Sequence, residues 1–145
     1  MNIKRILCPI DFSEFNEVTN QYASVLASAS GAEIVYLHVS IPDIPYGTTV
    51  YVDLEQDEER CRKQLQTINP TVEGVPAMHV VEFGTPANQI VTYAKENEID
   101  LIVMGTHGRT GFQRALMGSV AEVVVRKAEC PVLALKSGTK VPLNT

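Results

Sequence analysis

Short apolar runs alternate with amphipathic stretches along most of the chain. Three of these runs, at 3–9, 33–39 and 77–83, are rich in β-branched or aromatic residues and are bounded by proline, glycine or charged residues. Runs of this length and composition are typical of buried strands. Two more follow at 100–104 and 132–135. The pattern therefore predicts five strands.

Between the strands, apolar residues recur at the three- and four-residue spacing of a helix. The first such stretch follows Ser13, which we predict to be the N-cap, and ends at Gly31, where a glycine C-cap belongs. The charged stretch 53–68 predicts a surface helix, and further helices are predicted over 86–97 and 119–128. Prolines and a glycine between 42 and 52 indicate an irregular segment that could serve as a lid or variable loop.

Strands that alternate with helices require crossover connections, which predicts an α/β fold with a five-stranded, doubly wound parallel sheet. In such sheets ligands bind beyond the carboxyl ends of the strands, where the strand order reverses. The length of 145 residues predicts one domain, over 1–136, followed by a polar tail at 137–145. The residues just after 3–9 and 100–104 are therefore the first candidates for a site.

Composition and charge exclude several classes of function. The longest apolar runs fall well short of the roughly 18 residues of a membrane span, and the N-terminal run is too short for a signal peptide. We therefore expect a soluble, cytoplasmic protein with no membrane partner. A net charge of −5 without a basic run argues against nucleic acid as a partner. Three distant cysteines predict free thiols rather than a metal site, and Cys8, inside a strand, should be a poor nucleophile.

The segment after the fourth predicted strand carries the clearest chemical signal. Gly105, Gly108, Gly118 and Ser119 have the spacing G-x2-G-x9-G-S. Glycine permits positive φ and lets backbone N–H groups approach phosphate oxygens, while a helix N-terminus favours an anion. The alternative for Ser119 is a plain capping box with Glu122, and both interpretations can hold together. The segment is thus a candidate phosphate site.

Other polar residues near the two candidate strand ends have weaker signals. Asp11 follows the first strand and is either a turn residue or an acceptor for ribose hydroxyls. Arg109 and Arg114 could neutralise phosphates, although loop arginines are commonly solvated. His107 has no evident triad partner, and the sequence contains no Walker A loop, nucleophile elbow or zinc-protease helix.

Two stretches give the chain a resemblance to the universal stress protein family. The opening Ile6-Leu7-Cys8-Pro9-Ile10-Asp11-Phe12-Ser13 is similar to the first strand and acidic turn of that family. The segment from Asp100 to Leu135, with Val103-Met104-Gly105-Thr106-His107-Gly108-Arg109 and Gly118-Ser119-Val120-Ala121-Glu122, is the more specific match. The resemblance implies an adenine nucleotide alpha-hydrolase-like fold with strand order 3-2-1-4-5. It also implies a homodimer formed through the last strand, Val132-Leu135.

The resemblance further implies ATP as the ligand, with ADP or AMP as alternatives, and Mg²⁺ held by phosphate and water rather than by a dedicated metal site. Carried over residue by residue, it gives the nucleotide-binding set Pro9, Asp11, Val39, Met104, Gly105, Gly108, Arg109, Gly118, Ser119 and Val120. The resemblance implies no catalytic residues. The implied function is a nucleotide-dependent regulator in a stress response; the alternatives are a slow ATPase, an adenylyl-transfer enzyme, and a nucleotide-free interaction module.

Overall fold

A computed structural model of the chain describes residues 2–41, 47, 53–107 and 117–140. The strands are β1 (Arg5–Pro9), β2 (Glu33–Ser40), β3 (Ala77–Phe83), β4 (Leu101–Gly105) and β5 (Val132–Leu135), and the helices are α1 (Phe15–Ser30), α2 (Leu54–Leu65), α3 (Pro86–Glu96) and α4 (Ser119–Lys127). The predicted strands and helices are confirmed, with ends that differ by a few residues. The proposed lid at 42–52 lies almost wholly outside the described residues.

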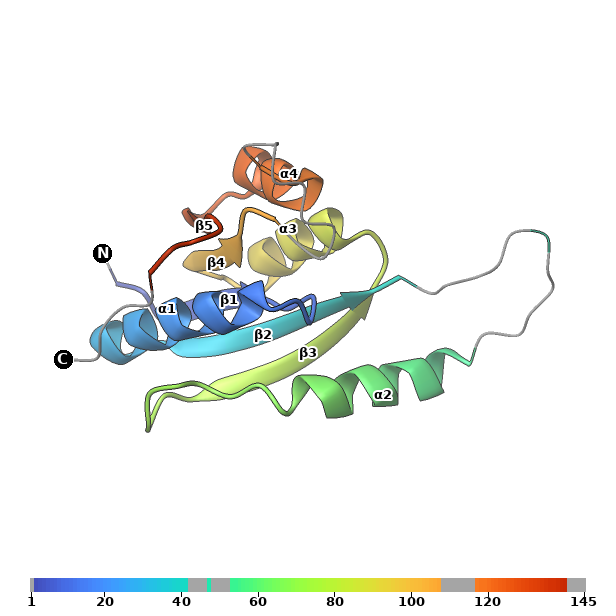
Figure 1. Cartoon of the computed structure of the whole chain (residues 1–145), viewed down its shortest axis with the longest axis horizontal. Coiled ribbons are helices and arrows are strands. Elements are labelled where there is room, and N and C mark those ends of the chain that lie inside the picture. Colours follow the sequence, from blue (N-terminus) through green and yellow to red (C-terminus); the bar gives the residue numbers. More distant parts are fainter. Residues whose placement is uncertain (1, 42–46, 48–52, 108–116, 141–145) are drawn as a thin grey trace.

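The strands form one parallel sheet in the order β3-β2-β1-β4-β5, as predicted (Figure 1). The chain builds outward from β1 to β3 on one side and then returns to place β4 on the other side of β1. The strand order therefore reverses between β1 and β4. This is the point at which open α/β sheets bind ligands.

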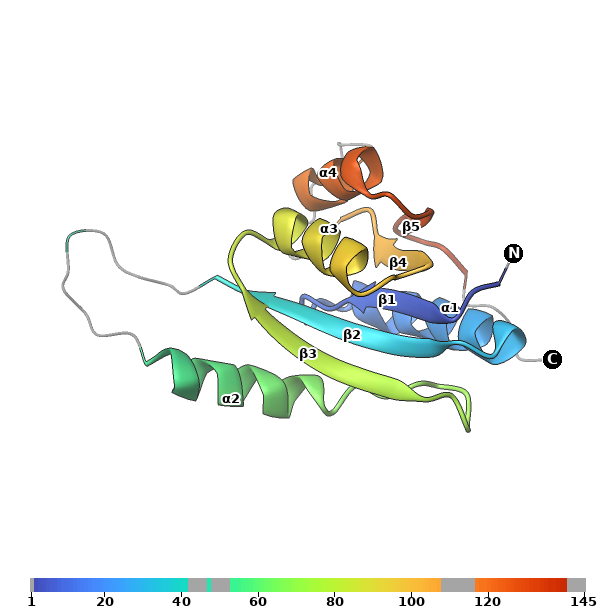
Figure 2. The same cartoon turned by 180° about the vertical axis from the view of Figure 1, so that it is seen from behind.

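Helices cover both faces of the sheet, and the alternation of side chains along the strands sorts the core into two layers (Figures 1 and 2). Ile6 and Cys8 face α1 and α2, whereas Leu7 points to the other face, toward α3 and α4. All three are fully buried. Because both faces are covered, the buried centres of β1, β2 and β4 are continuous apolar runs rather than alternately apolar and polar.

Buried polar side chains join α1 to the sheet and to the segment after α2. The Tyr36 hydroxyl donates to Asn20 Oδ1 at 2.6 Å, and Asn20 Nδ2 donates to the carbonyl of Asn69 at 2.8 Å. Ser24 Oγ donates to the carbonyl of Asn20 and accepts from the amide of Thr71. These bonds satisfy polar groups that would otherwise be unpaired in the core.

Helix α1 ends as predicted, but its start differs from the prediction. Gly31 adopts φ 76° and its N–H bonds to the carbonyl of Ala27, a left-handed C-cap. At the other end Glu14 holds the N-cap position without a side-chain bond, so the prediction that Ser13 is the N-cap is wrong. Ser13 is instead part of a turn, because its N–H donates to Asp11 Oδ1 at 2.9 Å.

No helix in the described part of the chain is long and apolar enough to cross a bilayer. The described residues of the polar tail, 137–140, turn back toward the domain, and the carbonyl of Lys140 accepts from the Tyr22 hydroxyl at 2.8 Å. The division into a domain at 1–136 and a tail stays a prediction.

Candidate functional site

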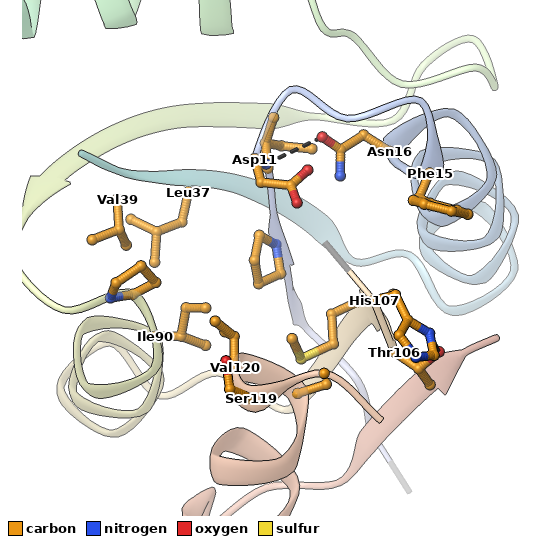
Figure 3. A pocket seen from close by; sticks show the side chains of 17 residues that line it. Asp11, Phe15, Asn16, Leu37, Val39, Ile90, Thr106, His107, Ser119 and Val120 are labelled. Carbon is orange, nitrogen blue, oxygen red and sulfur yellow. Dashed lines mark hydrogen bonds between the residues drawn. The ribbon is translucent and has the colours of Figure 1, made fainter. Parts of the chain in front are cut away.

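A cavity of about 200 Å³ lies where the carboxyl ends of β1, β2 and β4 meet the first turns of α1, α3 and α4 (Figure 3). It occupies the position at which the strand order reverses. Its lining residues are Pro9, Ile10, Asp11, Phe15, Asn16, Leu37, Val39, Pro86, Ile90, Met104, Gly105, Thr106, His107, Gly118, Ser119, Val120 and Ala121.

One part of the cavity wall is apolar. Its lining includes Pro9 from β1 and Met104 from β4. Val39 from β2, Ile90 from α3 and Val120 from α4 also contribute side chains to it (Figure 3). Met104 is 5% exposed, so it is held in place by the core beneath it. An apolar enclosure of this kind suits a flat, hydrophobic ring with polar atoms at its edge.

The opposite part is polar and is built on the loop from β1 to α1. The N–H of Asp11 donates to Asn16 Oδ1 at 3.1 Å, and Asp11 Oδ1 accepts from the N–H of Ser13 at 2.9 Å. These two bonds fix both the backbone and the side chain of Asp11. The other carboxylate oxygen, Oδ2, accepts no hydrogen bond from the described residues, so it is available to a ligand donor.

Two further contacts hold this loop from the side of β2. His38 Nδ1 lies 2.8 Å from the carbonyl oxygen of Ile10; because that oxygen can only accept, the ring nitrogen donates. Phe12 has φ 63°, an unfavourable backbone conformation for a bulky residue, and its ring centroid lies 4.5 Å from that of His38. Strain of this kind persists only where surrounding contacts over-determine the loop.

The N-terminus of α4 forms the third wall. Gly118 is its N-cap, with no side-chain cap bond, and the first intrahelical bond runs from the N–H of Glu122 to the carbonyl of Gly118. The N–H groups of Ser119, Val120 and Ala121 thus have no intrahelical acceptor. Three donors at the positive end of a helix dipole therefore lie at the cavity, an arrangement that suits an anion.

Of the two roles predicted for the glycines at this site, a positive φ is not found at Gly105 or Gly118, and close approach to a phosphate stays a prediction. A Cβ on Gly118 would lie 3.0 Å from the carbonyl oxygen of Thr106, and one on Gly105 would lie 3.3 Å from that of His107. The missing side chains allow the end of β4 and the start of α4 to approach each other, and the N–H of Gly118 donates to Thr106 O at 2.6 Å.

The capping-box interpretation of Ser119 is wrong. Gly118 is extended and its N–H donates to the carbonyl of Thr106, so α4 begins one residue earlier than a serine cap requires, and Ser119 is its first helical residue. The Ser119 side chain is exposed at the cavity rim. The carboxylate of Glu122 pairs with Arg126 at 3.6 Å instead of returning to the cap. The hydroxyl of Ser119 is therefore not used in capping.

Every described residue of the predicted binding set lines this one cavity, while Gly108 and Arg109, like Arg114, lie outside the described residues. Their contact with a nucleotide stays a prediction. The sequence analysis missed Asn16, whose only signal was its place five residues after Asp11 on the following helix.

Cys8 lies buried in β1, and His107 lies at the cavity. Burial raises the pKa of the Cys8 thiol to about 12, against a partial opposing effect of its bond to Thr19, so this cysteine is a poor nucleophile as predicted. His107 lines the cavity, and its Nδ1 lies 3.0 Å from Thr106 Oγ1. Among the described residues, no group of three His, Cys, Asp or Glu side chains could hold a metal ion.

Comparison with known proteins gives the family. The model of the universal stress protein family matches residues 2–136. The chain belongs to the universal stress protein family. Universal stress protein MJ0531 of Methanocaldococcus jannaschii is 34% identical over 143 residues, covering 94% of this chain and 84% of the relative.

Solved structures agree with this assignment. The structure of the hypothetical protein MJ0577 is 28% identical, with a TM-score of 0.75, and covers 97% of this chain and 100% of its own. A universal stress protein from Archaeoglobus fulgidus in complex with dAMP is 22% identical, with a TM-score of 0.61, over 94% and 100% of the two chains. The predicted adenine nucleotide alpha-hydrolase-like fold is confirmed.

Proposed function

We propose that this universal stress protein binds an adenine nucleotide, ATP in the first place, in the cavity between β1, β4 and α4. The observation that carries the proposal is that one cavity combines three features: an apolar wall, the Asp11 carboxylate and the three N–H groups of α4 that have no intrahelical acceptor. These suit a base, a ribose and a phosphate chain respectively. A relative of the same fold has been solved with dAMP.

Mg²⁺ would enter with the nucleotide. Asp11 is the one carboxylate among the described residues that line the cavity, so phosphate oxygens and water would supply most of the ligands. Phosphate charge would be neutralised by the ion and by the N-terminus of α4. The residues described here therefore fit a magnesium-bound nucleotide without a metal site of their own.

We propose a regulatory role in a stress response, in the cytoplasm, rather than dedicated catalysis. A nucleotide that binds one state of a protein better than another shifts the population of states without turnover. Such a shift would act on the interface between the two copies of a dimer. A partner protein would then recognise the nucleotide-bound dimer.

Calorimetric titration of ATP and Mg²⁺ tests binding. We expect a dissociation constant on the order of micromolar for the parent protein, equivalent to about −8 kcal/mol. Ser119→Asp places a carboxylate at the first residue of α4, which favours the helix but repels phosphate, so affinity should fall at least tenfold. Ser137→Asp, exposed in the tail, adds the same charge away from the cavity and should bind like the parent. Absence of binding to the parent, with no nucleotide released on denaturation, would refute the proposal.

We also propose a homodimer formed by edge-to-edge contact of β5. This strand pairs with β4 in the described structure, and Val132 to Leu135 are all half-buried. The carbonyl of Pro131 accepts from Ile102 in β4 and that of Leu135 from Thr106 just after β4, so by the alternation of a parallel ladder the N–H of Ala134 points away from β4. An unpaired apolar edge of this kind favours a second copy of the same strand.

A proline at 134 tests this dimer selectively. Ala134→Pro removes an outward N–H without removing a donor to β4, so the fold should persist while the dimer weakens. Ala134→Thr keeps the N–H and should remain dimeric. Sedimentation of both variants and the parent at several concentrations measures the difference. A parent that sediments as a monomer, or a proline variant as dimeric as the parent, would contradict the proposal.

A further inference from the structure

The side-chain amide of Asn16 is oriented into the candidate nucleotide cavity. Asn16 is the second residue of α1 and is half-buried. Its Oδ1 accepts from the N–H of Asp11 at 3.1 Å. Figure 3 shows its amide nitrogen on the same side of the loop as the Asp11 carboxylate, directed toward the cavity.

The identity of the two amide atoms follows from chemistry. A backbone N–H can only donate, so the atom that faces Asp11 N must be the oxygen. The atom left for the cavity is therefore Nδ2, with two hydrogens to donate. No acceptor for Nδ2 occurs among the residues that the structure describes, although a half-buried amide gains from having one.

A purely structural role would not require an amide. The bond to Asp11 N needs only an acceptor, and aspartate would supply one with an added benefit from the dipole of α1. Asparagine is also a weak helix former at this position compared with alanine. An amide in place of a carboxylate has two consequences at the cavity: it avoids a second negative charge beside Asp11, and it adds a donor.

Together the two side chains form a matched pair. Asp11 offers Oδ2 as an acceptor, because Oδ1 already accepts from Ser13, and Asn16 offers Nδ2 as a donor. The hydrogen bond from Asp11 N to Asn16 Oδ1 holds the two residues in place relative to each other. Two neighbouring hydroxyls, each able to donate and accept, are the ligand group that satisfies both at once.

We propose that Asn16 and Asp11 jointly recognise the vicinal diol of a ribose, so that the site prefers ribonucleotides to deoxyribonucleotides. The proposal rests on the nucleotide binding proposed above. Asp11 accepts from one hydroxyl and Asn16 donates to the other. Asn16 is thus a specificity-determining residue, and loss of either hydroxyl leaves one protein group unpaired.

The test compares ATP, 2′-deoxyATP and 3′-deoxyATP by calorimetric titration into the parent, Asn16→Ala and Asp11→Asn. Each deoxy analogue should bind the parent about fivefold or more weakly, the size expected for one net hydrogen bond. In Asn16→Ala one of the two penalties should fall below about twofold while the other persists; Asp11→Asn should show the reverse.

This pattern separates direct recognition from positioning. If Asn16 only held Asp11 in place, Asn16→Ala would lose the same penalty as Asp11→Asn or neither penalty, and the proposal would be overturned. If the parent bound ATP but showed no deoxy penalty, this proposal alone would fail. If the parent bound no adenine nucleotide, the proposed function would fail with it.

A charge variant provides a second test that keeps the loop bond. Asn16→Asp retains an acceptor for Asp11 N but turns a donor into a second carboxylate, so ATP affinity should fall at least tenfold. Asn69→Asp makes the same chemical change at an exposed position outside the cavity and should bind ATP like the parent. Equal ATP affinity of Asn16→Asp and the parent would refute direct contact.

Discussion

Gly118→Ala should destabilise the protein even though its backbone conformation suits alanine. With φ −70° and ψ 164°, the residue has no need of glycine for conformational reasons. The substitution would by itself stabilise the fold by about 0.4–1 kcal/mol through the unfolded chain. The opposing effect is steric, because the new Cβ would lie 3.0 Å from the carbonyl oxygen of Thr106.

That oxygen cannot retreat freely. It accepts from the N–H of Gly118 at 2.6 Å, so moving it by a few tenths of an ångström weakens the bond that joins the end of β4 to the start of α4. Overpacking of this kind costs about 1–3 kcal/mol. The difference between the two effects leaves a net destabilisation of about 0.5–2 kcal/mol.

Urea denaturation measures this difference. With a slope of about 1–3 kcal/mol per molar urea, the midpoint should fall by roughly 0.2–2 M. Ser119→Ala is the matched control: the side chain is exposed and makes no cap bond, so its stability should stay within about 0.5 kcal/mol of the parent. If Gly118→Ala were as stable as the parent or more so, the steric account of this glycine would be refuted.

Three other perturbations probe the stability of the fold. Tyr36→Phe leaves Asn20 Oδ1 without its 2.6 Å donor and should lower the free energy of unfolding by about 1–3 kcal/mol; an unchanged urea midpoint would contradict this. Cys8 stays neutral in the folded protein up to a pKa of about 12, while the unfolded thiol ionises from about 9. Between these values the unfolded state binds fewer protons, so stability falls as pH rises, by at most about 1.4 kcal/mol per pH unit from this group. Urea midpoints measured from pH 8 to 11 should therefore decline less for Cys8→Ala than for the parent, and parallel declines would show that the thiol contributes nothing. Asp100 accepts from the backbone N–H groups of Lys4 and Arg5 at 2.8 and 3.0 Å, so Asp100→Ala should lower the thermal midpoint, corresponding to about 1–3 kcal/mol; a melting curve that matches the parent's would count against it.

The strands could be predicted because burial on both faces makes them continuously apolar, whereas their order was implied by the resemblance to universal stress proteins. Leu7 and Cys8 point to opposite faces of the sheet, yet both are fully buried, so the run reads as continuously apolar. The place of the cavity followed from the doubly wound sheet, because such sheets bind ligands where the strand order reverses.

The helix starts were not predictable from local sequence. Ser13 and Ser119 both stand where serine caps are common, but neither caps a helix. In one case the Asp11 side chain takes the N–H of Ser13, and in the other the carbonyl of Thr106 fixes Gly118. Contacts between segments, which a local pattern does not contain, decide where these helices begin.

Asn16 illustrates the remaining limit. Its residue type is unremarkable in the first turn of a helix, and only the position of the β1–α1 loop shows which of its two amide atoms remains for a ligand. Composition and spacing gave the elements that face the cavity. They could not give the direction of a side chain.

The order in which the strands are made has a consequence for synthesis on the ribosome. The first three strands can pair as soon as Phe83 has emerged, but they leave one edge of β1 bare until residues 101–105 follow. The walls of the cavity are completed later still, by α4 at 119–127. While the chain grows from Phe83 to residues 101–105, the sheet is half built, and the bare edge of the central strand β1 is an aggregation hazard during that interval.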